Sequence, residues 1–195
     1  VLCSGGLLVH AMQYDDLDPV ETEFVRASVA ECLLQGDWIC AEMRTPQLVR
    51  FLIELLPGPD MVCSKAEYAL ERVAEKEASL SPLVVERLID VLKHPDGPAR
   101  DRAAAVLYEV IRFRPQEATP QIADLLVDLL EDSDRGVCCK AAYALEQVAD
   151  RRLDLAERLM ARLQGLLSAP REAGCTWAMG VLESVLLAYP EMATL

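Results

Sequence analysis

The segment KAEYALERVA, residues 65–74, recurs as KAAYALEQVA at residues 140–149, with eight of its ten letters unchanged. Such a repeat constrains the fold more than composition does, because similar segments form similar elements that stack on one another. Its leucine belongs to a column of four leucines at intervals of 37, 38 and 37 residues: Leu70, Leu107, Leu145 and Leu182. The repeat unit therefore occurs four times.

Two further columns accompany the leucines. An alanine stands four residues before each leucine and a valine three residues after it: Ala66, Ala103, Ala141 and Ala178, and Val73, Val110, Val148 and Val185. Offsets of −4, 0 and +3 lie on one face of an α-helix. Each copy is therefore predicted to be a helix whose small, large and β-branched side chains face the core.

Another helix is predicted before each of these. Apolar pairs recur upstream at intervals of 36 to 38 residues: Leu55 and Leu56, Val91 and Leu92, Leu129 and Leu130, Leu166 and Leu167. In three copies the segment opens with a hydroxyl residue followed by proline, which suits the N-cap and first turn of a helix: Thr45 and Pro46, Ser81 and Pro82, Thr119 and Pro120. Short polar turns follow the apolar pairs. Each unit is predicted to contain a first helix, a turn and a second helix.

A helical hairpin of this size cannot bury its apolar face alone, so neighbouring copies must stack. The segments PDMVCSKAEYAL, PDGPARDRAAAVL and DSDRGVCCKAAYAL resemble the HEAT-repeat, armadillo-like α-solenoid family. The segment PREAGCTWAMGVL departs from that pattern, because Trp177 stands where the other units have a basic residue. The resemblance implies an all-α fold, a right-handed α-solenoid of stacked helical hairpins.

We expect four HEAT-like repeats in residues 45–195, at about 45–80, 81–118, 119–154 and 155–189, forming one continuous solenoid. Residues 1–44 fit the columns less well and are predicted to be a degenerate N-terminal helical repeat or a cap. The final segment, VLESVLLAYPEMATL, lacks the polar outer face that a terminal repeat needs. We therefore expect either a continuation of the solenoid or a partner at this end.

Charge and cysteine content narrow the classes of partner and compartment. A formal net charge of −13 repels phosphate backbones and anionic membranes, which argues against nucleic acid and membrane partners. No apolar run approaches the roughly 18 residues that span a bilayer. The seven cysteines form no Cys-x-x-Cys pair, and an odd number without such pairs favours a reducing, cytoplasmic compartment.

No residues suited to catalysis or to cofactor binding emerge from the sequence. Neither His10 nor His94 is followed by glutamate, so the His-Glu pairs that hold iron in HEAT-like deoxyhypusine hydroxylases are missing. Cys63, Cys138 and Cys175 share one slot, seven residues before the repeat leucine. Stacked helices lie about 8 to 10 Å apart, too far for one zinc ion, so these cysteines are predicted to be small buried residues. We predict no enzyme, no metal and no cofactor.

Tyrosines and carboxylates occupy the face of the second helices that points away from the core. The resemblance implies that second helices line the concave side of the solenoid, where these residues would form one surface. Tyrosine offers a large contact area, and carboxylates select cationic partners. The predicted partner-binding residues are Tyr68, Glu71, Glu75, Tyr108, Tyr143, Glu146, Asp150, Trp177 and Glu183.

These features predict a non-enzymatic scaffold or adaptor that binds another protein through a basic or helical segment. Two alternatives come from the same resemblance. One is a lyase or cofactor-handling protein of the HEAT-like bilin lyase type. The other is a nucleic-acid-binding protein similar to the HEAT-like alkylpurine DNA glycosylases, whose cationic groove this acidic chain does not offer.

Overall fold

The computed structural model describes residues 44–58, 60–168 and 172–190, and this part of the chain contains helices and turns without a strand. The helices are α3 (Pro46–Glu54), α4 (Asp60–Lys76), α5 (Ser81–Val91), α6 (Gly97–Phe113), α7 (Pro120–Asp128), α8 (Arg135–Arg151), α9 (Leu153–Leu167) and α10 (Glu172–Ala188). Three short 3₁₀ turns connect them: η2 (Ala78–Leu80), η3 (Pro115–Glu117) and η4 (Leu129–Glu131). The expected N-terminal repeat or cap lies outside the described residues, apart from Arg44.

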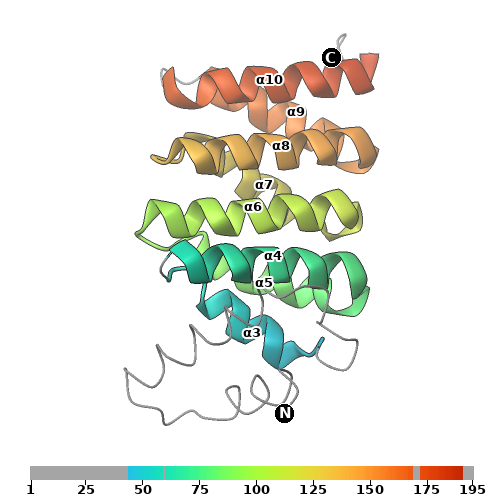
Figure 1. Ribbon diagram of the computed structural model, residues 1–195. Helices are drawn as coiled ribbons and strands as arrows, with labels where there is room; N and C mark the ends of the chain where they lie inside the picture. Colours follow the sequence, from blue (N-terminus) through green and yellow to red (C-terminus); the bar gives the residue numbers. More distant parts are fainter. Residues whose placement is uncertain (1–43, 59, 169–171, 191–195) are drawn as a thin grey trace, which may run out of the picture. The chain divides into compact units, whose positions relative to one another are not determined.

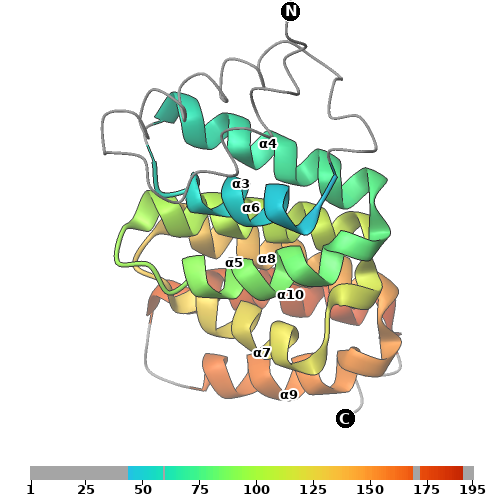
Figure 2. The ribbon, with the colours of Figure 1, turned by 90° about the horizontal axis from the view of Figure 1, so that it is seen from below.

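The chain divides into two compact units, residues 1–103 and 104–195, with the boundary inside α6. In the first unit α3 contacts α4 and α5, and α4 also contacts α5. In the second unit α8 contacts α7, α9 and α10, and α7 packs beside α9. Here α8 and α10 form one layer and α7 and α9 another (Figures 1 and 2). Second helices thus pack on second helices, and first helices on first helices.

The three sequence columns form the core of the second helices. Every alanine and every valine of these columns is fully buried, as are Leu70, Leu107 and Leu145. The fourth leucine, Leu182 on α10, is only half-buried. Fully burying one leucine side chain contributes about 1.5 to 3 kcal/mol, so these columns supply much of the stabilisation. The predicted inward-facing stripe is confirmed.

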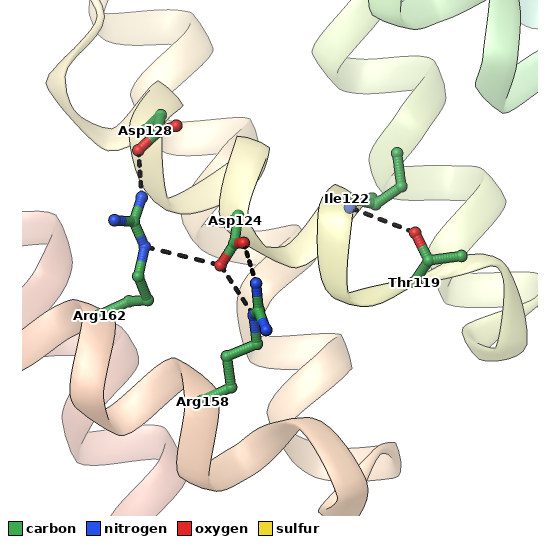
Figure 3. Close-up of polar contacts among 6 residues, drawn as sticks. All are labelled: Thr119, Ile122, Asp124, Asp128, Arg158 and Arg162. Carbon is green, nitrogen blue, oxygen red and sulfur yellow. Dashed lines mark hydrogen bonds and ion pairs between the residues drawn. The ribbon is translucent and has the colours of Figure 1, made fainter.

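Two of the three predicted N-caps are present and one is wrong. The hydroxyls of Thr45 and Thr119 accept hydrogen bonds from the backbone N–H groups of Leu48 and Ile122, each at 3.3 Å (Figure 3 shows the second). Both threonines have extended backbones, which aim the hydroxyl back at the helix. Ser81 instead follows η2 directly and has helical dihedrals of −55° and −44°. Its buried hydroxyl has no hydrogen-bond partner in the described part of the chain.

Aspartates in the turns cap the N-termini of two second helices. Asp96 accepts a hydrogen bond from the backbone N–H of Ala99 at 3.2 Å, and Asp134 accepts one from Gly136 at 2.8 Å. Side-chain capping of this kind stabilises a helix by about 1 kcal/mol. These caps fix where α6 and α8 begin, and so which of their residues face outward.

Arg152, at the junction of α8 and α9, ties this junction to the segment that follows α6. Its guanidinium donates hydrogen bonds to the carbonyl oxygens of Pro115 at 3.0 Å and Ala118 at 2.9 Å. Two further bonds run to Asp154, at 2.8 and 2.7 Å. The contacts to Pro115 and Ala118 connect residues 34 to 37 positions apart, about one repeat. Arg152 therefore sets the spacing between consecutive hairpins of the second unit.

Candidate partner-binding surface

Two tyrosines meet on the outward face of the second helices in the second unit. The ring centroids of Tyr108 on α6 and Tyr143 on α8 lie 6.1 Å apart, with ring planes at 53°. Tilted aromatic pairs at this distance attract one another beyond simple burial. Tyr143 nevertheless keeps 45% of its surface exposed. The pair is therefore a rigid aromatic platform that still has area to offer a ligand.

Carboxylates occupy the outward positions of the second helices α8 and α10, and Glu146 lies close to Tyr143. Glu146 is half-buried on α8, and burial raises its pKa because the charged form loses solvation. Glu183 on α10 is exposed. Within the described residues, neither carboxylate has a cation in ion-pair range. Asp150, also exposed, lies 3.8 Å from Arg151, at the outer limit of an ion pair. We call Tyr108, Tyr143, Glu146, Asp150 and Glu183 the tyrosine-carboxylate surface.

The Tyr143 hydroxyl stays protonated at neutral pH. A hydrogen bond with the Cys139 thiol, one turn earlier on α8, is the main reason that its pKa lies above the ordinary value, and the nearby carboxylate of Glu146 contributes as well. A protonated hydroxyl can donate a hydrogen bond to a peptide carbonyl. The platform therefore combines an apolar ring face with a polar edge.

The first unit carries residues at the same repeat positions, and their surroundings differ. Tyr68 on α4 is 55% exposed and Glu71 is half-buried. Glu75 lies 2.5 Å from the guanidinium of Arg72 and 3.1 Å from the ammonium of Lys76. The pKa of Glu75 is lowered, first by its hydrogen bond with Lys76. This carboxylate is already neutralised by its own helix and has little charge left for a partner.

Trp177, the ninth predicted site residue, lies half-buried on α10. The described contacts do not join it to the tyrosine pair. The structure thus brings together residues that the sequence placed 35 positions apart, Tyr108 and Tyr143, while the predicted role of Trp177 stays a prediction.

Two aspartates on α7 are paired with arginines of α9, unlike Glu146 near the tyrosines. Asp124 on α7 accepts hydrogen bonds from both ends of the Arg158 guanidinium, and Arg162 lies 3.6 Å from the same carboxylate (Figure 3). Asp128 pairs with Arg162 at 2.5 Å. The hydrogen bond from Arg158 lowers the pKa of Asp124. This network neutralises the two aspartates of α7.

The sequence contains the pattern behind this network, although the columns of apolar residues did not reveal it. Two aspartates four residues apart are followed, 34 positions later, by two arginines four residues apart. Residues at i and i+4 share one face of a helix, so two such pairs on adjacent parallel helices meet as a ladder. Complementary charge pairs at the repeat period are therefore a useful signal for solenoids.

Of the histidines and cysteines considered in the sequence, the structure places His94, Cys63 and Cys138 as follows. His94 lies in the turn before α6, where its Nδ1 accepts a hydrogen bond from the backbone N–H of Asp96. Cys63 and Cys138 are buried free thiols, as predicted, and burial is the main reason that the pKa of Cys138 is raised. The side chain of Cys175 and all of His10 lie outside the described residues. No group of three or more potential metal ligands clusters in the part of the chain described.

None of the helices described here combines the length and the apolar character required to cross a lipid bilayer.

Comparison with known proteins gives similarity in structure alone. No family model matches the sequence, and no curated protein matches it. An engineered protein superposes with a TM-score of 0.58 and 21% identity, over 93% of this chain and 48% of that one. A designed armadillo repeat protein in complex with the peptide (KR)4 gives 0.59 and 18%, over 93% of this chain and 82% of that one. UNC-45 from Drosophila melanogaster gives 0.64 and 16%, over 98% of this chain and 26% of that one.

The chain thus spans about half of the first of these proteins and about a quarter of UNC-45. Sequence identities this low establish similarity of fold, but they do not establish function. The paired helices, the buried repeat columns and the three superpositions agree on one architecture. The chain has the armadillo- or HEAT-like helical repeat fold, an all-α solenoid.

Proposed function

We propose that this protein is a non-enzymatic interaction scaffold, and that its tyrosine-carboxylate surface holds a basic segment of another protein. The observation that carries the proposal is the contrast between its two faces. In the second unit, Asp124, Asp128 and Asp154 on α7 and α9 are paired with arginines, whereas Glu146, close to the part-exposed Tyr143, makes no ion pair within the described residues, and neither does Glu183 on α10. Unpaired carboxylates next to aromatic rings favour a lysine or arginine side chain.

Each member of the surface would contribute in a different way. The exposed ring of Tyr143 offers contact area and a face for a cation. Glu146 is already partly desolvated, so an arriving cation meets a carboxylate that has given up part of its hydration. Exposed Glu183 and Asp150, together with the net charge of −13, steer a basic ligand toward the protein.

The comparison with the designed armadillo protein is consistent with this partner class. That structure shows a designed armadillo repeat protein in complex with the peptide (KR)4. The expected concave placement of the surface, and the contribution of Tyr68 and Glu71 from the first unit, remain proposals. A cytoplasmic location is also a proposal, and it rests on the free thiols of Cys63, Cys138 and Cys139.

Binding of a labelled (Lys-Arg)4 peptide, followed by fluorescence anisotropy, tests the proposal. The double variant Glu146→Lys/Glu183→Lys should weaken binding by about tenfold or more, equivalent to about 1.4 kcal/mol, because two attractive charges become repulsive. Tyr143→Ala should weaken binding even at high salt, where charge steering is screened. Glu157→Lys, at an exposed site on α9, is the control for each of these two charge reversals made singly, since it makes the same charge change as one of them. Equal losses in the control and in the double variant would reject this surface.

Peptide affinity should also fall at mildly acidic pH. Glu146 binds a cation only when ionised, and its raised pKa means that it takes up a proton earlier than an ordinary glutamate, whose pKa is about 4.3. The loss of affinity should therefore begin while the pH is still above that value. Protonation of a group whose pKa is raised by folding favours the folded state, so Glu146 itself does not promote acid unfolding. The Glu146→Gln variant should lack this early component, and an unchanged profile in that variant would contradict the assignment.

A further inference from the structure

Three apolar positions that are covered on the inner second helices are open on α10. They lie at offsets of −3, 0 and +4 from the repeat leucine. On α6 and α8 all of them are buried, with at most 3% exposed: Ala104, Leu107 and Ile111, and Ala142, Leu145 and Ala149. On α10, Met179 is 62% exposed, and Leu182 and Leu186 are only half-buried. Met179 is larger than the alanines at its position on α6 and α8, yet within the described residues it and its two neighbours in the stripe are left open.

These side chains line a shallow groove along α10 with a volume of about 630 Å³. The groove runs from Thr176 to Leu187, and Leu187 is 75% exposed. A Cβ atom added at Gly180 would meet no atom within 4 Å, so the backbone of α10 is open to close approach there. Eleven helical rises separate its ends, about 17 Å or three turns. A helix of three to four turns fits this length.

The repeat itself indicates the shape of the occupant. Helix α8 carries the same three positions, and there they are buried. Helix α10 packs against α8. A ligand that covers the equivalent positions of α10 would therefore be another helix, with an apolar stripe at i, i+3, i+4 and i+7. The area it covers would be of the kind that solenoids bury between consecutive repeats.

Charge decides between a second copy and a different partner. Glu183 is the one charged residue among those lining the groove, and it makes no ion pair within the described residues. Two copies joined through this groove would place Glu183 near its counterpart and bring two net charges of −13 together. Like charges facing each other oppose association. A helix with lysine or arginine beside its apolar stripe would instead complement Glu183.

We propose that the groove on α10 is a docking site for a basic amphipathic helix of a partner protein. Met179, Leu182 and Leu186 receive its apolar stripe, Gly180 permits close approach, and Glu183 pairs with a basic side chain at its edge. This site is distinct from the tyrosine pair on α6 and α8, although Glu183 is counted in both the groove and the tyrosine-carboxylate surface. It does not depend on the function proposed above.

The test uses a synthetic helical peptide of leucine, alanine and lysine, with its apolar residues at i, i+3, i+4 and i+7. It should bind the whole protein, and Met179→Gln/Leu187→Gln should weaken binding by at least tenfold. Both residues are highly exposed and glutamine is a good helix former, so the variant should keep its circular dichroism spectrum and melting temperature. Tyr143→Ala should bind this peptide as well as the wild type does. Glu183 is left unchanged in this comparison, because it is counted in both surfaces.

Four results would overturn the proposal. The first is equal binding by the wild type and the glutamine variant, or no binding by either. The second is weaker binding of the helical peptide by Tyr143→Ala, which would place the peptide on the tyrosine-carboxylate surface. The third is equally tight binding of a counterpart with glutamate in place of lysine. The fourth is a wild-type dimer in analytical ultracentrifugation that the glutamine variant converts to monomer, which would make a second copy the occupant. Loss of (Lys-Arg)4 binding alone would concern the proposed function and not this site.

Discussion

Leu145→Ala should lower the free energy of unfolding by about 2 to 5 kcal/mol, the range for a buried leucine whose removal leaves a cavity. Leu145 is fully buried on α8, a helix that contacts α7, α9 and α10. Because α8 is packed against three helices, a cavity within it cannot collapse easily. The same change at Leu182 should have a smaller effect, since that side chain is half-buried and borders the open groove on α10. Urea unfolding followed by circular dichroism measures both values.

Leu107→Ala provides the internal control for this prediction. Leu107 occupies the same repeat position on α6 and is also fully buried. Its effect should match that of Leu145→Ala more closely than that of Leu182→Ala. Equal effects at all three leucines would contradict a stack in which inner second helices are covered and α10 is open.

Arg152→Ala should destabilise the second unit by about 2 kcal/mol. The substitution leaves the carbonyl oxygens of Pro115 and Ala118 without their hydrogen-bond donor, and each unpaired, partly buried acceptor costs about 1 to 3 kcal/mol when no water replaces the donor. Arg152→Lys should recover only part of this loss, because an ammonium group cannot reproduce the fork of the guanidinium. Thermal unfolding measured by circular dichroism reports the difference.

Arg158→Ala is the matched control for Arg152→Ala. It removes an arginine of the same unit, but one whose partner is the carboxylate of Asp124 at the surface. Exposed ion pairs contribute little to stability, so its effect should be clearly smaller. If the two arginine variants unfolded at the same temperature, the role assigned to Arg152 would be wrong.

The apolar columns predicted the second helices well because burial fixes them directly. Residues at offsets −4, 0 and +3 face a neighbouring repeat. The spacing of the alanines, leucines and valines in the sequence is therefore enough to predict which side chains are packed. The N-cap at Ser81 failed for a local reason. The dipeptide Ser-Pro is the same as at a true cap, but η2 runs into α5 without an extended residue between them. The identity of two residues does not determine the dihedral angles at such a junction.

The candidate surface was predicted in part. The outward positions of Tyr108 and Tyr143 followed from the helical period, and the structure adds that the two rings contact each other. Their different offsets from the repeat leucine concealed this contact, because ring contact depends on how α6 and α8 are staggered. Neutralisation of Glu75 by Arg72 and Lys76 was also missed, because side-chain pairing within one turn depends on rotamers. Outward positions are therefore predictable, whereas their electrostatic state is not.

The proposed function places a basic segment at the tyrosine pair on α6 and α8. Nuclear magnetic resonance of the tyrosine rings, recorded while (Lys-Arg)4 peptide is added, tests it most directly. The ring signals of Tyr108 and Tyr143 should shift together with the same apparent Kd as measured by anisotropy, while the signal of Tyr189, beyond the end of α10, should stay in place. Shifts confined to Tyr189 or Tyr68, or unchanged rings at a peptide concentration that saturates the anisotropy, would contradict the account.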